Sequence, residues 1–171
     1  MMFGFYSLLK KCRKAERQRR HIAGFTTLEL LIAVAIAAIL AALAAPSFTT
    51  MIANQRAKNV ASELFASLLR ARSEALARNT SVTLSPKTGN WQNGWRIVDP
   101  TNTDKFLDDQ NMTSGATITG PVSVVYTGTG RIQGSSVPMF VIKSMAGSTP
   151  TYQCVSVELS GRPYMQAASS C

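Results

Sequence analysis

The sequence predicts an α+β protein in which a long N-terminal helix, transmembrane and then amphipathic, packs on an antiparallel β-sheet domain. Three observations lead to this fold class. Residues 25–45 are almost entirely apolar, residues 46–79 carry a one-sided apolar stripe at helical spacing, and residues 80–171 change to Thr, Ser, Gly, Val and aromatic residues between turn signals. A chain of 171 residues is long enough for one modest globular domain with an appendage.

The apolar segment 25–45 is long enough to cross a bilayer as a helix, which takes about 20 apolar residues. Glu29 near its start is out of place there, because an ionised carboxylate in lipid is costly and usually has a partner. Pro46 follows the segment and is expected to break or kink the helix locally, since proline lacks a backbone donor and clashes with the preceding turn.

Most of the positive charge precedes this segment. Residues 1–24 hold seven Lys and Arg and one Glu, so they contribute +6 of the net charge of +9. The high pI is therefore no evidence for a nucleic-acid partner. A basic run directly before an apolar helix holds the N-terminus on the cytoplasmic side and places the C-terminal domain on the other side of the membrane; a solvated charge run without a topological role is the alternative.

The cysteines agree with export of the C-terminal part. Cys12 lies in the basic leader, whereas Cys154 and Cys171 lie far downstream, where an exported domain meets an oxidising compartment. Two exported cysteines can form one disulfide, and closing that short loop contributes on the order of 3 kcal/mol. Two free or buried thiols remain the alternative, because a pair alone does not reveal its connectivity.

The N-terminal segment has three interpretations. An ordinary secretory signal would be cut after small residues such as Ala42-Leu43-Ala44, but the apolar run is long for such a signal and contains Glu29. A plain membrane anchor leaves Glu29 unexplained. In the third interpretation the cut follows Gly24, on the cytoplasmic side of the apolar segment, and the helix stays on the mature protein.

GFTTLE before a long apolar helix resembles the class III signal of type IV prepilins and type II secretion pseudopilins. The resemblance implies cleavage after Gly24, methylation of the new N-terminal amine of Phe25, Glu29 as the fifth mature residue and Pro46 as the twenty-second. It also implies a membrane peptidase as processing partner, which removes the leader 1–24. The mature helix would then pack with those of other pilins or pseudopilins on an inner-membrane assembly platform.

The resemblance gives Glu29 a partner, the new amine at Phe25 of a neighbouring subunit. An unpaired buried charge is far more costly than a paired one, so the pairing would select one register of helix packing. The alternative is a Glu29 side chain that reaches the headgroup layer.

The helix is expected to continue to residue 79 with an amphipathic second half. Its apolar stripe comprises Ala57, Val60, Ala61, Leu64, Leu68, Ala71 and Ala75, widened by Phe65, Leu69 and Leu76. Candidate strands are Ser81–Pro86, Gly94–Asp99, Ala116–Thr119, Val122–Thr127, Arg131–Gln133, Met139–Lys143, Tyr152–Leu159 and Arg162–Met165. The aspartate-containing stretch 100–114 reads as a solvated surface loop, with a calcium site as the alternative.

Later segments of the chain resemble the GspH/FimT (FimU-like) type of minor pilin and pseudopilin. These segments are RARSEALARNTSVTL, NWQNGWRIVD, TGTGRI and a late strand containing SGR before a terminal Cys. Trp91 and Trp95 are expected to pack inside the domain. Some relatives of this type capture DNA through a Gly-Arg-x-Arg motif; here Gly161 and Arg162 match, but Tyr164 replaces the second Arg.

The sequence does not support an enzyme and implies no cofactor. The only His is His21, inside the leader, so neither a Ser-His-Asp arrangement nor a His-based metal cluster can form in the mature chain. The leading hypothesis is a minor pilin, a structural and priming subunit of a type IV pilus. Alternatives are a GspH-like pseudopilin of a type II protein secretion system and, further, a DNA-binding minor pilin for natural transformation.

Overall fold

The computed structural model describes residues 24–111, 115–168 and 171. One long helix, α1 (Thr27–Arg78), is followed by strands that form two antiparallel sheets, which is the predicted α+β architecture. The backbone stays helical through position 46, so Pro46 does not end the helix. By contact, the chain divides into one unit up to Ala41 and a second from Ala42 to Cys171.

The first sheet has the strand order β3-β2-β1-β5, and the second has the order β4-β6-β7-β8. The strands of the first sheet are β1 (Val82–Pro86), β2 (Trp95–Asp99), β3 (Asn102–Gln110) and β5 (Val124–Tyr126). Those of the second are β4 (Ala116–Thr119), β6 (Met139–Ala146), β7 (Thr149–Val157) and β8 (Pro163–Ala168). Two short 3₁₀ turns, η1 (Lys87–Gly89) and η2 (Trp91–Asn93), connect β1 to β2.

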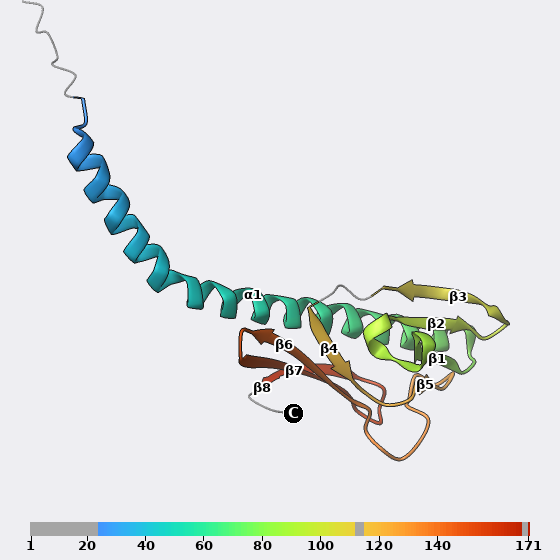
Figure 1. Cartoon of the computed structure of the whole chain (residues 1–171). Coiled ribbons are helices and arrows are strands. Elements are labelled where there is room, and N and C mark those ends of the chain that lie inside the picture. The colour runs from blue at the N-terminus through green and yellow to red at the C-terminus, as the bar shows by residue number, and fades with distance from the viewer. Residues whose placement is uncertain (1–23, 112–114, 169–170) are drawn as a thin grey trace, which may run out of the picture. The chain divides into compact units, whose positions relative to one another are not determined.

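Within the second unit, both sheets lie along the same helix (Figure 1). The seven positions of the predicted central stripe, from Ala57 to Ala75, are all buried, and they share one core with residues of both sheets. Of the three residues expected to widen the stripe, Phe65 is half-buried, whereas Leu69 and Leu76 lie at the exposed rim. The stripe of α1 is thus the common surface on which two separate sheets are assembled.

The two tryptophans anchor the sheets inside the domain, as expected. Trp95 is fully buried, and its Nε1–H donates a hydrogen bond of 2.8 Å to the hydroxyl of Ser67 on α1. Trp91 donates to the carbonyl of Pro121 at 2.7 Å and packs edge-on against Phe140, with 4.8 Å between ring centroids. Each indole N–H is therefore satisfied, which keeps the burial of both rings favourable.

The expected surface loop over residues 100–114 is wrong for most of its length, because residues 102–110 form β3, an edge strand paired with β2. The strand carries acidic residues that pair with cations elsewhere in the domain. Asp108 lies 3.2 Å from Arg70 of α1, and Asp109 pairs with Lys87 of η1. Charged residues are common on edge strands because they oppose pairing with other chains.

A second correction concerns residues 131–133, which were expected to form a strand. Only an isolated bridge joins Ile132 to Tyr126 there. The segment is instead the end of a tight turn, in which the Thr127 amide donates to the Arg131 carbonyl at 2.9 Å and the Gly130 amide donates to the Thr127 carbonyl at 2.8 Å.

Neighbouring leucines on α1 test how much the stripe contributes to stability. Leu68 is 0% exposed and Leu69 is 42% exposed. We expect Leu68→Ala to lower the free energy of unfolding by about 2–5 kcal/mol, because it leaves a cavity between helix and sheets. Leu69→Ala, the matched control, should cost well under half as much. Urea unfolding of the detergent-solubilised full chain measures both values, and equal losses would contradict this core.

Candidate functional site

The apolar half of α1 is not covered by any other part of the described residues. Residues 27–44 form a helix that is long and apolar enough to cross a membrane, and none of this span is buried in the structure. Phe25 is 82% exposed and Leu28 is 66% exposed. A helix that is apolar all round must be buried in lipid or against other helices.

The start of this helix is capped by its own residues. The hydroxyl of Thr26 accepts a hydrogen bond of 3.2 Å from the amide of Glu29, and the carbonyl of Thr26 accepts from the amide of Leu30 at 3.1 Å. Thr26 is therefore the N-cap, and Glu29 occupies the third helical position. A negative charge there interacts favourably with the positive end of the helix dipole. The spacing Thr-x-x-Glu is that of a capping box, a signal present in the sequence that our reading of the motif missed.

Gly24 and Phe25, the residues at the expected cut, precede the first turn of α1. Both are exposed and lie outside regular secondary structure. The leader itself, with Cys12, His21 and its basic residues, lies outside the described residues.

The expected cysteine pair is joined in the structure. Cys154 of β7 and Cys171 form a disulfide, with their Cα atoms 5.8 Å apart. Cys154 faces Gln166 of β8 and Val141 of β6 across the sheet. The bond thus fastens the end of the chain to the middle of the second sheet.

The expected DNA-contact residues lie in the turn between β7 and β8. Gly161 has φ of +86°, and a Cβ there would lie 1.8 Å from the Gly130 carbonyl oxygen. The same carbonyl accepts a hydrogen bond of 3.0 Å from Arg72 of α1. Gly161 is therefore required for the close approach of two turns, whatever Arg162 does. Arg162 is exposed, and its carbonyl accepts from the Glu158 amide at 3.0 Å.

Two polar side chains of the second unit have shifted pKa values that are explained by burial and by hydrogen bonds within the fold. Burial raises the pKa of the Tyr126 hydroxyl, which has no hydrogen-bond partner in the described residues. Hydrogen bonds from Thr101 lower the pKa of Asp99, and Arg78 adds to this effect from 3.6 Å. In the described ranges, no cluster of three or more His, Cys, Asp or Glu is placed to hold a metal ion.

Comparison with known protein families shows which family this chain belongs to. The family described as "Type II transport protein GspH" matches residues 60–161, which is more than half of the chain. The chain belongs to the GspH family. A second family, described as "Prokaryotic N-terminal methylation motif", matches residues 19–45. The GspH-family chain therefore carries the N-terminal signal and the pilin-like domain that the sequence predicted, and it is a structural subunit rather than an enzyme.

Solved structures agree on the fold of this GspH-family chain. Two crystal forms of the type IV minor pilin FimU from Pseudomonas aeruginosa PAO1 are similar to it. One has a TM-score of 0.56 at 21% identity and covers 68% of this chain and 96% of FimU. The other has a TM-score of 0.53 at 22% identity and covers 67% of this chain and 98% of FimU. The search of curated proteins gave no match.

Glycine substitutions separate the architectural role of Gly161 from any role in binding. Gly161→Ala should destabilise the domain strongly, because it combines a positive φ with overlap against the Gly130 carbonyl. Gly147, with φ of +61° and open space around it, is the matched control. Gly147→Ala should cost only about 1–2 kcal/mol, the penalty of the left-handed conformation. Equal unfolding midpoints for the two variants would contradict this assignment.

Proposed function

We propose that the chain is a minor pilin of a type IV pilus, processed after Gly24, methylated at Phe25 and assembled through α1. The observation that carries the proposal is the exposed apolar helix that begins within the GFTTLE signal, at Thr27. In the membrane its first half sits among lipid, with the N-terminus cytoplasmic and residues 80–171 in the periplasm. In the filament the same surface is buried against the helices of other pilins.

In this proposal Glu29 neutralises the amine of Phe25 on a neighbouring subunit. The carboxylate lies one turn into the helix, so two helices must shift along their axes for the groups to meet. The attraction between opposite charges is strong in lipid and an unpaired charge is costly there, so the pair favours one axial register. Pro46 has no backbone N–H, so the carbonyl of residue 42 lacks its usual helical hydrogen bond. We expect α1 to loosen at this position in a packed filament.

Glu29 variants separate charge pairing from helix capping. Both roles need Glu29, but a capping box accepts Gln as well as Glu, whereas neutralising an amine requires the charge. We expect Glu29→Gln and Glu29→Ala to be cleaved like the wild type, yet to reach the filament at least about tenfold less, since even 1.4 kcal/mol of lost pairing gives that ratio. Thr26→Ala, which removes only the cap, should be incorporated nearly normally.

The measurement is the ratio of subunit in purified filaments to processed subunit in the membrane, by immunoblotting. Normal incorporation of Glu29→Gln together with failure of Thr26→Ala would assign Glu29 to capping and overturn its pairing role. Failure of cleavage in the Glu29 variants would place the residue in peptidase recognition instead.

A pseudopilin of a type II secretion system is the second candidate function, because such subunits share the same signal and domain. The match to the GspH family supports it. The likeness to FimU over 96% of that minor pilin supports the pilus, as do the SGR ending and the Cys154–Cys171 bond. Neighbouring genes for pilus assembly, or instead for secretin-linked secretion, distinguish the two.

Capture of DNA is a further candidate, favoured by the exposed side chains of Arg131 and Arg162 near the β7–β8 turn. Residues 46–171 carry 11 basic and seven acidic side chains, a net charge of only +4. If DNA is bound, the affinity should fall steeply with salt, and Arg162→Ala should reduce the salt slope by about one. Lys143→Ala on another part of the domain is the charge-matched control. No gel retardation of duplex at low salt would remove this function.

A further inference from the structure

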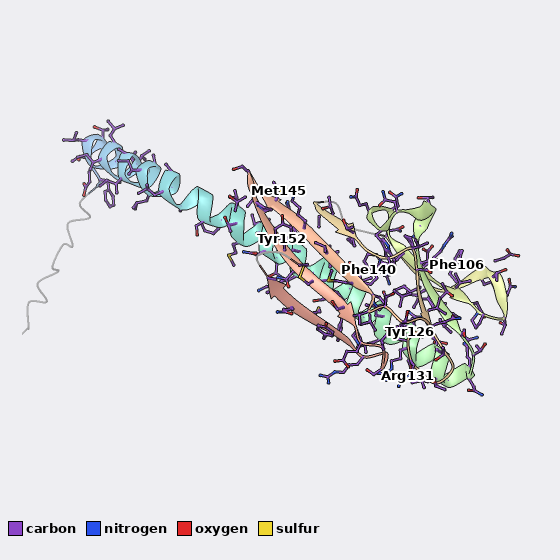
Figure 2. All side chains as sticks on the ribbon, turned by 90° about the horizontal axis from the view of Figure 1, so that it is seen from below. Phe106, Tyr126, Arg131, Phe140, Met145 and Tyr152 are labelled. Atoms are coloured by element: carbon purple, nitrogen blue, oxygen red, sulfur yellow. A yellow bond between two sulfur atoms is a disulfide. The ribbon has the colours of Figure 1, made fainter. Side chains whose placement is uncertain are left out.

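A groove of about 520 Å³ lies between α1 and the second sheet. It is lined by Asn54 and Lys58 of α1, by Tyr152 and Gln153 of β7 and by Ala167 of β8. Figure 2 shows Tyr152 and Met145 at one end of the domain and Arg131 near the C-terminal end of α1, far from them. The groove is therefore separate from the β7–β8 turn that contains Gly161.

Gln153 is the most unusual residue of the groove. It pairs with Ile142 and Ala167 across the sheet, so its side chain points to the same face as the core residues Ile142 and Phe140. It is 8% exposed, and its carboxamide makes no hydrogen bond to any described residue. The carboxamide is not among the described side-chain atoms that are fully buried without a partner, so it is open to solvent. Gln153 lines the groove, where a ligand can replace water as its hydrogen-bond partner.

Lys58 adds an unpaired positive charge to the same groove. It is exposed, and like several other surface cations of the domain it forms no ion pair within the described ranges. The charged residue that lines the groove is thus a cation beside two carboxamides. A carboxylate suits this set, because it accepts hydrogen bonds from an ammonium group and from amide N–H groups at once.

The third wall of the groove is a free strand edge. β8 is the last strand in the order β4-β6-β7-β8, so in the described part of the chain its outer backbone groups have no strand beside them. Unpaired edges accept an extended segment of another chain by strand addition, with side-chain pockets giving specificity. The groove beside Ala167 is such a pocket.

The position along α1 indicates which molecule reaches the groove. Asn54 is ten residues beyond Ala44, the end of the candidate membrane span, which corresponds to about 15 Å along a helix. The headgroup layer on each side of a bilayer is only about 5–8 Å thick. Asn54 and Lys58 therefore belong to the part of α1 that follows the candidate membrane span, and if helices of other subunits pack against α1, segments of those subunits can reach the groove.

We propose that this groove binds an extended, Asp- or Glu-containing segment of a neighbouring filament subunit, which adds to the edge of β8 and places its carboxylate between Lys58 and Gln153. The inference rests on the proposed function, since it requires assembly with other subunits. The proposed segment adds a contact between subunits outside the membrane to the packing of their helices. The edge of β8 sets the direction in which the segment runs, and Lys58 favours a segment with a negative charge.

Photocrosslinking in cells that assemble the filament tests the contact with the full chain. A benzophenone amino acid at position 167 reports on the groove, and the same group at position 166, the next residue of β8 with its side chain on the opposite face, is the matched control. We expect an adduct from position 167 to another filament subunit, with the linked peptide containing Asp or Glu when identified by mass spectrometry. Position 166 should give at least about fivefold less of that adduct.

Charge reversal tests the chemistry of the contact. Lys58→Glu should lower the adduct yield from position 167 at least tenfold, the ratio that about 1.4 kcal/mol produces. Lys143→Glu, the same change on the opposite face of β6, should leave the yield within twofold. Gln153→Met keeps the volume but removes the carboxamide, so it should lower the yield while leaving the fold at least as stable. An acid-to-Lys change in the linked peptide should restore the yield with Lys58→Glu.

Each other outcome has a defined meaning. An adduct to lipid, no subunit adduct from position 167, or an unchanged yield in Lys58→Glu would overturn the inference while leaving the proposed function intact, provided that the wild-type chain enters the filament. Absence of the wild-type chain from the filament would overturn both.

Discussion

The structure depends on one helix that has to satisfy two environments. Residues 27–44 of α1 expose apolar side chains on every side, whereas from Ala57 onward the apolar residues form a single stripe that is buried under two sheets. The hydrophobic effect drives both halves, but the first can be satisfied only by lipid or by other subunits. One continuous helix therefore contains both the surface that folds the domain and the surface that other subunits or lipid must cover.

The buried stripe of α1 and both sheets share one hydrophobic core. Leu64 and Leu68 of α1 share a core with Trp95 of the first sheet and Phe140 of the second. Ion pairs from Arg70 and Lys87 hold the polar edge strand β3, and Arg72 holds the turn at Gly130. Because Arg70 and Arg72 lie on the polar flanks of α1, the helix helps to position the strand edge and the turn as well as the core.

The sequence predicted what periodicity and motifs encode, and it failed where pairing partners decide. The stripe from Ala57 to Ala75 has a clear helical period, and all seven central positions are buried. β3 was missed because most of its residues are polar and show no apolar alternation; its pairing with β2 and the ion pair between Asp108 and Arg70 depend on the tertiary fold. The unpaired carboxamide of Gln153 could not be foreseen either, since it depends on strand register and on the helix that crosses the sheet.

The proposed function requires that the chain enters the filament with α1 intact and with a new charged terminus directly before it. Intact-mass and N-terminal peptide mass spectrometry of the subunit from purified filaments tests this requirement. We expect a chain that begins at Phe25 with one added methyl group on its amine. A chain that retains residues 1–24, or one that begins after Ala44 as an ordinary signal cleavage would produce, would contradict it.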